Sequence, residues 1–252
     1  MHTLKRAIEI LDYIVKAPNG ITATEISKHF GMSLSNACKY LSVFTEYGYL
    51  RRNSDKIYYP GFKLLEYGSI ILRKFDLRDI AHKSLIELMA QTGQTVHLIV
   101  KDGFEGVYID KVEGVNSIPM VSKIGMRAPF YSTSAGKAIL AHMPMQEFEN
   151  YLSSVVLKRR TNKTIVDPNE LRKEIIRTRE RGYAIDDEES EAGIRCIGAA
   201  ILNHEGYPIA AVSISGATSV LTDNVILNFG EKVVNCAKSI SEKLGYKNEK
   251  RR

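Results

Sequence analysis

The feature that most constrains the fold is a pair of short helices, each with clear start and stop signals, predicted near the N-terminus. Thr22 and Glu25 form the capping-box pattern of a helix start, and Gly31 ends that helix after about two turns. Ser33 is a good N-cap for a second helix, which Gly48 ends. Two short helices joined by a tight glycine turn are typical of the helix-turn-helix motif.

A helix is predicted before this pair, and two strands are predicted after it. Apolar residues recur at helical spacing between residues 4 and 15, with Thr3 as the expected cap and residues 18–20 as the end. Ile21 and Ile26 occupy the positions of a hydrophobic staple. Residues 49–52 and 56–59 read as strands around the polar turn 53–55. We therefore predict a winged helix-turn-helix domain over residues 1–61.

The polar face of the helix that follows Ser33 suits contact with DNA. A major groove about 12 Å wide admits one helix, and short polar side chains near the N-terminus of that helix can approach the base edges. Residues 1–62 carry eight Lys or Arg and five Asp or Glu, and the whole chain has a net charge of +6. A three-helix bundle with a solvated polar face is the alternative. The predicted DNA-binding residues are Thr22, Ser33, Ser35, Asn36, Lys39, Arg51, Arg52 and Lys56.

A connecting helix is predicted over residues 62–76, followed by a second helix to residue 91. The connecting helix is more apolar than a simple spacer needs to be. Two interpretations are open: it forms a dimer interface, or it packs against the chain's own C-terminal part. The first is favoured because DNA readers of this kind usually bind two half-sites related by a dimer axis. We expect a homodimer or a homotetramer.

The hydrophobic period changes from Gln94 onward, and the rest of the chain mixes strands and helices. Adjacent strands joined by short turns predict a largely antiparallel α+β domain over residues 77–246, with a disordered tail at 247–252. The sequence contains no βαβ pattern of the kind that would suggest a dinucleotide-binding fold. The predicted strands are 95–100, 107–110, 118–121, 194–202 and 208–215, and the predicted helices are 135–142, 146–152, 168–181 and 223–244.

Several protein classes are not favoured by the composition. The first 15 residues contain Glu9 and Asp12 and no small-residue cleavage site, so they do not resemble a signal peptide. No apolar run approaches the roughly 18 residues that span a bilayer. Three widely spaced cysteines give neither a disulfide framework nor a paired zinc motif. We expect a cytoplasmic protein with reduced thiols and no membrane association.

No cofactor or metal is expected either. The stretch SAGKA (134–138) resembles the end of a phosphate-binding loop, but that motif requires glycine where Tyr131 stands and Ser or Thr where Ala138 stands. The six histidines show no metal-ligand spacing. The acidic run 186–189, together with Glu191, is expected to be a solvated loop with one inward-facing member.

Two stretches, YSTSAGKAILA (131–141) and GYAIDDEESEAGIRCIGAAILNHEGYPIAAVSISG (182–216), resemble the signature segments of the IclR family of transcription regulators. The N-terminal pattern and the connector match the same family in order and spacing. The resemblance implies a GAF/PAS-like effector-binding domain that takes small organic acids or aromatic compounds. We therefore predict a sequence-specific DNA-binding regulator, a repressor rather than an enzyme, controlled by a small carboxylate such as a keto acid or sugar acid.

The family's pocket positions carry over to specific residues of this chain. The resemblance implies that Ser134, Ala135, Asp186, Cys196, Ser213 and Ser215 contact the effector, with Met120 and Ala128 as apolar wall positions. The hydroxyl of Ser134 departs from the family pattern, in which Gly or Ala is common at this position.

The residues themselves support such a pocket. Ser134, Ala135 and Gly136 open a helix whose N–H groups and dipole favour a carboxylate. Ser213 and Ser215 are two residues apart on a predicted strand and so face the same side.

Two other functions are considered. In a cysteine-dependent enzyme, Cys196 would be the nucleophile, with His97 or His204 as the base and Asp186 orienting that base. In a DNA-binding scaffold, the C-terminal domain would bind no ligand at all.

Overall fold

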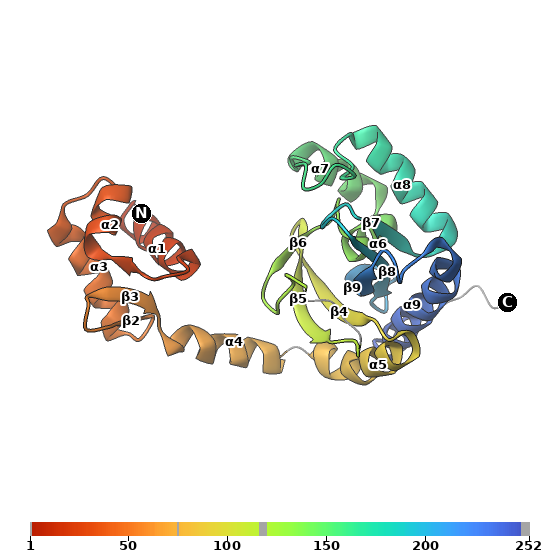
Figure 1. Cartoon of the computed structure of the whole chain (residues 1–252), viewed down its shortest axis with the longest axis horizontal. Coiled ribbons are helices and arrows are strands. Elements are labelled where there is room, and N and C mark those ends of the chain that lie inside the picture. The colour runs from red at the N-terminus through yellow and green to blue at the C-terminus, as the bar shows by residue number, and fades with distance from the viewer. Residues whose placement is uncertain (1, 75, 116–119, 248–252) are drawn as a thin grey trace. The chain divides into compact units, whose positions relative to one another are not determined.

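In the computed structural model, which describes residues 2–74, 76–115 and 120–247, the chain divides into two units. Unit 1 is Met1–Phe75 and unit 2 is Asp76–Arg252. Figure 1 shows that each unit has its own helices and its own sheet. Except for residue 247, the expected disordered tail lies outside the described residues.

Unit 1 has the predicted winged helix-turn-helix architecture. The capping box of Thr22 and Glu25 and the N-cap of Ser33 are both formed, so these predicted helix starts are confirmed. A short strand, which the sequence did not predict, completes a three-stranded antiparallel sheet in the order β1-β3-β2. The elements are α1 (His2–Lys16), β1 (Ile21–Thr22), α2 (Ala23–His29), α3 (Leu34–Glu46), β2 (Leu50–Arg52), β3 (Ile57–Pro60) and α4 (Phe62–Lys74).

The core of unit 1 differs from the sequence pattern in α1. Thr3 lies inside the helix and is not its cap, and Leu4 and Ile8 are 70% and 60% exposed. The helix buries Ile10 and Ile14 instead. These two residues are one turn apart, so they lie on the same side of the helix, which faces the core. These two join a cluster that also contains Ile21, Ile26, Ala37, Leu41, Leu50 and Tyr58.

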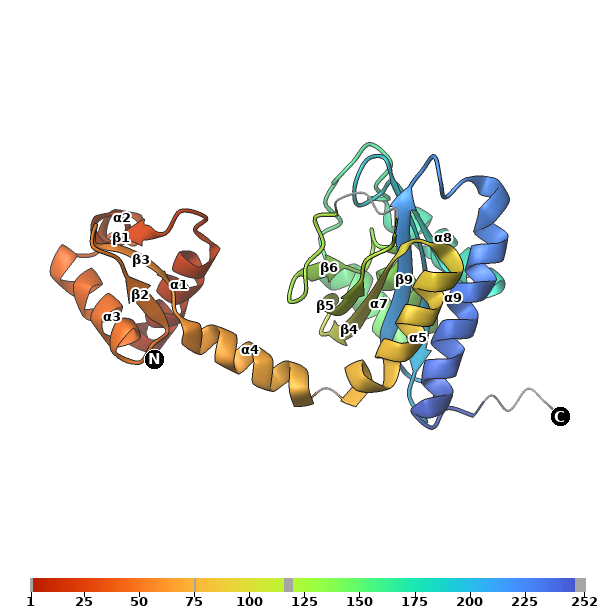
Figure 2. The ribbon, with the colours of Figure 1, turned by 60° about the horizontal axis from the view of Figure 1, so that its bottom comes forward.

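Unit 2 is built on a six-stranded antiparallel sheet with the order β6-β5-β4-β9-β8-β7. Helices α5 and α9 pack on one face of the sheet, and α6 packs on the other face with α7 and α8 outside it (Figures 1 and 2). This is the predicted α+β class. The elements are α5 (Asp76–Thr92), β4 (Thr95–Asp102), β5 (Glu105–Val112), β6 (Arg127–Pro129), α6 (Ser134–His142), α7 (Met145–Ser154), α8 (Pro168–Arg181), β7 (Ala184–Asp187), β8 (Ile194–Leu202), β9 (Pro208–Ala217) and α9 (Asp223–Lys243).

Both edge strands of this sheet differ from the prediction. Of the expected strand 118–121, residues 118 and 119 lie outside the described residues, and Met120 and Val121 are not in a strand. The edge next to β5 is instead β6, and the opposite edge is β7, which was expected as loop. Strands of three or four residues are too short to show a clear alternation of apolar and polar side chains.

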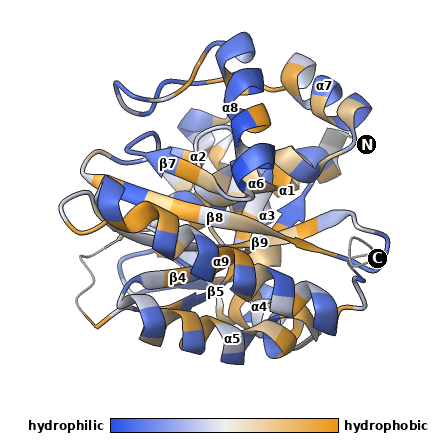
Figure 3. Ribbon diagram, turned by 90° about the vertical axis from the view of Figure 1, so that its right-hand side faces the viewer, coloured by the Kyte–Doolittle hydropathy of each residue, from blue (hydrophilic) through white to orange (hydrophobic). Residues whose placement is uncertain are grey.

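Helix α6 is the most enclosed helix of unit 2, because it lies between the sheet and α8. Its residues from Ser134 to Ala141 are all buried. Gly198 on β8 allows the close approach: a Cβ atom there would lie 2.7 Å from the backbone nitrogen of Ala135. In Figure 3 hydrophilic colours predominate along α8, whereas β8 is largely pale or orange. The N-terminus of α6 is therefore held directly against the sheet.

Strand β5 contains one extra residue, a β-bulge, which changes the side chains that face each side of the sheet. Tyr108 pairs with Ile99, whereas Asp110 pairs with Leu98, so Ile109 is unmatched. Because Leu98 and Ile99 point to opposite faces, Tyr108 and Asp110 do so as well. The buried Asp110 faces α5, where its carboxylate lies 2.6 Å from Nδ1 of His82.

Candidate functional site

The register of the sheet brings the predicted ligand residues of unit 2 together. Asp186 on β7 pairs with Cys196 on β8, and Cys196 pairs with Ser215 on β9. Paired residues project from the same face, so these three side chains are neighbours on adjacent strands. Ser213, two residues from Ser215, faces the same side and pairs with His97 on β4.

These side chains border a cavity of about 110 Å³ between the sheet and the start of α6. Eight of the nine predicted effector-binding residues line it: Met120, Ala128, Ser134, Ala135, Asp186, Cys196, Ser213 and Ser215. The ninth, Gly136, does not line the cavity. Its N–H donates to the Thr133 hydroxyl at 3.1 Å, and the backbone of Phe130 lies against its Cα.

The N-terminus of α6 supplies one end of the pocket. Thr133 is the N-cap, and its hydroxyl donates to the carbonyl of Pro129 at 2.7 Å while accepting from Gly136. Ser134 and Ala135 line the cavity from the first turn. The helix end therefore presents its positive dipole to the cavity through these two residues.

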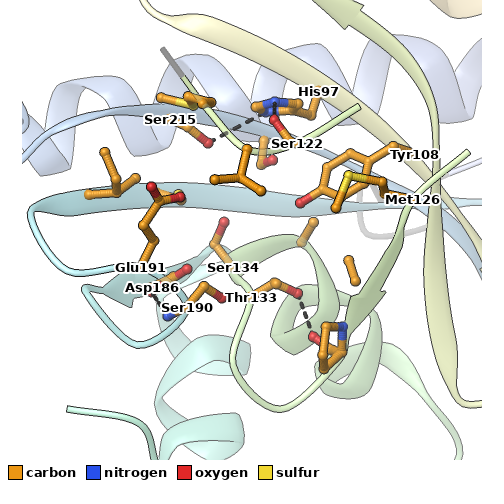
Figure 4. A pocket seen from close by; sticks show the side chains of 18 of the residues that line it. His97, Tyr108, Ser122, Met126, Thr133, Ser134, Asp186, Ser190, Glu191 and Ser215 are labelled. Carbon is orange, nitrogen blue, oxygen red and sulfur yellow. Dashed lines mark hydrogen bonds between the residues drawn. The ribbon is translucent and has the colours of Figure 1, made fainter. Parts of the chain in front are cut away.

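His97 forms a neutral polar part of the pocket wall. Its Nε2 lies 2.8 Å from the Ser122 hydroxyl, and its Nδ1 lies 3.4 Å from the Ser215 hydroxyl (Figure 4). Burial, with a smaller contribution from the Lys111 charge, lowers the pKa of His97 to about 3. At neutral pH the ring is uncharged and has one donor and one acceptor nitrogen. The Tyr108 ring packs edge-on against it at 5.2 Å.

Asp186 forms the acidic part of the wall. Its carboxylate is almost fully buried and accepts hydrogen bonds from the N–H groups of Glu189 at 2.7 Å and Ser190 at 3.3 Å. Burial raises the pKa of Asp186 to about 6, against the opposing effect of Lys137. The expectation that this acidic run has one inward member is wrong, because Asp186 and Glu189 are both buried.

The surroundings of Cys196 do not favour the enzyme hypothesis. Burial and the neighbouring Asp186 carboxylate raise the pKa of the Cys196 thiol well above its ordinary value. A nucleophilic cysteine needs the opposite shift, because the thiolate is the reactive form. His204, one of the two candidate bases, is exposed and does not line the pocket.

Sequence reasoning missed several pocket residues or gave them no ligand role. These are His97, Tyr108, Ser122, Met126, Thr133, Arg160, Ser190 and Glu191. One signal could have identified His97: it is the only ionisable side chain within the apolar strand TVHLIV. The others come from loops or from strands whose register is not visible in a single sequence.

In unit 1, the predicted DNA-binding residues at α2 and α3 divide into two groups. Ser35, Asn36 and Lys39 are exposed on the first turns of the helix. The Ser33 hydroxyl accepts from the Asn36 N–H, and the Thr22 hydroxyl is bonded to Glu25, so both cap their own helices. Asn36 and Lys39 also line a hollow of about 830 Å³ between α1 and α3.

The wing presents its basic residues to solvent. Arg51, Arg52 and Lys56 are exposed, and Lys56 takes a positive φ of 63° in the turn. The Arg51 guanidinium lies 5.5 Å from the Tyr59 ring, and that of Arg52 lies 5.5 Å from the Tyr58 ring. Such stacking holds the side chains in place while the charges stay in water.

Two features are absent from the part of the chain that the structure describes. No cluster of His, Cys, Asp or Glu there has an arrangement that could hold a metal ion. No helix in that part of the chain is both long enough and apolar enough to cross a bilayer.

Comparison with known proteins gives consistent matches over both units. Residues 3–54 match the family model described as the IclR helix-turn-helix domain, and residues 70–242 match that of the bacterial transcriptional regulator IclR C-terminal domain. The chain is 36% identical over 247 residues to the HTH-type transcriptional regulator XynR of Escherichia coli, covering 98% of each chain. It is 31% identical to the transcriptional repressor IclR of the same species, covering 96% of this chain and 89% of the relative.

A solved structure extends the similarity to the fold. The IclR crystal structure from Thermotoga maritima is 53% identical and superposes with a TM-score of 0.80, covering 98% of this chain and 100% of that one.

Proposed function

The chain belongs to the IclR family of bacterial transcriptional regulators, and from this premise we propose that it is a repressor controlled by a small organic acid. Residues 1–61 bind an operator, residues 62–76 link the two parts and include the helix α4 (Phe62–Lys74), and residues 77–246 bind the effector. Because the target is chromosomal DNA, the protein acts in the cytoplasm. The observation that carries the effector role is the convergence of Asp186, Cys196, Ser213 and Ser215 on one cavity.

The exposed face of α3 and the wing are the proposed operator contacts. Ser35, Asn36 and Lys39 would enter the major groove, while Arg51 and Arg52 would neutralise backbone phosphates. A second copy of the chain would bind the other half-site. Within unit 1 the apolar side chains of Phe62 and Leu65 on α4 are 75% and 69% exposed, so they would be available for pairing between copies.

The pocket suits a small ligand with a carboxylate and at least one hydroxyl or carbonyl oxygen. Its volume of about 110 Å³ is well below that of pockets for drug-sized molecules, which start near 300 Å³. The N-terminus of α6 would bind the carboxylate. The hydroxyls of Ser213 and Ser215 would donate to ligand oxygens, and the Asp186 carboxylate would accept from a ligand hydroxyl.

Strand β5 offers a physical connection from this pocket towards the DNA-binding part. Tyr108 lines the cavity, and Asp110 on the opposite face contacts His82 and Arg78 near the start of α5. Helix α5 follows the linker helix in sequence. Ligand binding that displaces β5 would change the position of α5 and of the linker. The coupling free energy between two such sites is typically about 1–3 kcal/mol.

Lys39→Ala is expected to weaken operator binding. If Lys39 contacts a phosphate, the dependence of log K on log salt concentration should become shallower by about one unit. The operator would be found by footprinting upstream DNA, and affinity would then be measured across a salt series. Lys83→Ala on α5 removes the same charge from an exposed position in unit 2 and is the matched control. Equal operator affinities and equal salt slopes for both variants would remove Lys39 from the contact set.

The double variant Ser213→Ala with Ser215→Ala is expected to lose the response to the effector but to keep operator affinity. The wild-type melting temperature should rise with one member of a panel of 2-oxo acids and sugar acids, because a ligand that binds only the native state stabilises it. The double variant should show no rise with the same acid. Ser219→Ala, an exposed serine beyond β9, is the control.

A wild-type response in the double variant would contradict the pocket assignment. No rise with any acid would favour the scaffold alternative, and turnover of an acid would favour the enzyme.

A further inference from the structure

Lys137 is a cationic side chain with no exposed surface, in the middle of α6. It does not line the cavity, and neither the pocket nor the proposed DNA contacts use it. Its ammonium group forms an ion pair with Oε1 of Glu189, which is also buried. Removing two charges from water costs several kcal/mol for each ion, so such a pair needs a role beyond filling space.

Glu189 belongs to the turn that follows β7 and shapes the acidic side of the pocket. Its N–H donates to Oδ1 of Asp186 at 2.7 Å, and its carbonyl accepts from the Thr164 hydroxyl at 2.7 Å. The next residue, Ser190, donates its N–H to the same Asp186 oxygen and its hydroxyl to the carbonyl of Ser132. The position of Glu189 therefore fixes the orientation of the Asp186 carboxylate.

Among the described residues, Lys137 is the one hydrogen-bond partner of the Glu189 side chain. Oε2 of Glu189 is buried without a hydrogen-bond partner there, and Oε1 bonds to Lys137. The turn is thus tied to α6 through a single ion pair.

We propose that Lys137 is a positioning residue for the ligand pocket: its ion pair with Glu189 holds the turn after β7, whose N–H groups orient the Asp186 carboxylate in the cavity wall. The inference rests on the proposed function only in calling the cavity a ligand site. Asp186 is part of the cavity wall, whereas Glu189, the acid that pairs with Lys137, does not line the cavity.

The charges around the two acids support this arrangement. Asp186 pairs with Cys196 across β7 and β8, shares the cavity lining with Tyr108, Arg160 and Glu191, and has the effect of burial on its pKa opposed by the Lys137 charge on α6. Glu189 is close to Lys137, to Asp186 and to Glu174 on α8, and Glu174 is itself paired with Arg177 and Arg181. Burial raises the pKa of Glu189 to about 7, and Lys137 opposes that rise for both acids.

The test is the titration of Asp186 in the full-length protein without ligand or DNA. Carbon-13 NMR of labelled aspartate carboxyl groups gives the midpoint, and Asp186→Asn assigns the signal. Lys137→Met is expected to raise the midpoint by about one pH unit, a shift typical of losing a nearby opposite charge, because the Lys137 charge opposes the effect of burial on the pKa of Asp186. Glu189→Gln is expected to leave the midpoint nearly unchanged, because a Glu189 carboxyl with a pKa of about 7 is already largely protonated near the Asp186 midpoint of about 6, and the glutamine amide keeps an oxygen that accepts from Lys137.

A raised midpoint in Lys137→Met with a nearly unchanged one in Glu189→Gln is the signature of the proposal. A merely structural role would loosen the turn in both variants and move Asp186 in the same direction. Ile139→Val, a buried change on the same helix without any change of charge, should leave the midpoint unaltered. If Lys137→Met does not fold, Lys137→Gln, which removes the charge but keeps a polar side chain, should raise the midpoint in the same way.

Similar shifts in both variants, or no shift in Lys137→Met, would overturn the inference. Because this titration needs no effector, it separates the two hypotheses. The expected pair of results without any thermal response to acids would retain the positioning role and reject the effector function.

Discussion

Gly198→Ala is expected to lower the free energy of unfolding of unit 2 by about 3 kcal/mol, at the upper end of the usual cost of overpacking. The added Cβ would lie 2.7 Å from the Ala135 nitrogen and 2.7 Å from the Ser134 carbonyl carbon. Both are backbone atoms and cannot rotate away, so α6 must move off the sheet. The same movement would widen the pocket, because Ser134 and Ala135 line it. Chemical denaturation followed by circular dichroism measures the loss.

The matched control is Gly68→Ala on α4. A Cβ there meets nothing within 4 Å, and the backbone is helical. Alanine is the better helix former by about 1 kcal/mol, so this variant should be as stable as the wild type or slightly more stable. Equal stabilities for the two variants would show that α6 is not seated against β8 as described.

Leu41→Ala is expected to destabilise unit 1 by roughly 2–5 kcal/mol, the usual range for truncating a fully buried leucine. Leu41 has no exposed surface and joins the cluster formed by α1, α2, α3 and the small sheet. A domain of this size rarely has more than about 3–5 kcal/mol of stability, so most of it would be lost. Operator binding should disappear because α3 is no longer held in place.

Hydrogen exchange is the suitable measurement, because it reports on each unit separately. Amides of α3 should lose protection in Leu41→Ala, while those of β8 and β9 should keep theirs. Val43→Ala, a change at a 52% exposed position of the same helix, should stay within about 0.5 kcal/mol of the wild type. Protected α3 amides in Leu41→Ala would contradict the assigned core.

Helices with strong end signals were the most predictable part of the fold. The predicted helix 168–181 coincides with α8, because Asp167 caps its start and Gly182, in the left-handed conformation, ends it. Such signals depend on residues only three or four positions apart, so they can be recognised in a single sequence. The edge strands β6 and β7 were missed because their pairing depends on partners elsewhere in the chain.

The pocket was predictable in part for the same reason. The alternation of Ser213 and Ser215 is local, and both residues do line the cavity. The contact between His97 and Ser215 joins residues 118 positions apart, and no local pattern gives the register that creates it. The burial of Glu189 likewise depends on Lys137, 52 positions away in the chain.

The unmatched Ile109 in β5 has an electrostatic consequence for the pocket. Counting along the strand in twos from Tyr108 would assign Asp110 to the ligand side, where it would be a third acid beside Asp186 and Glu191. Because Ile109 is unmatched, the Asp110 carboxylate lies instead on the face of the sheet that α5 covers. The domain thereby keeps one negative charge away from the anionic molecule it is proposed to bind.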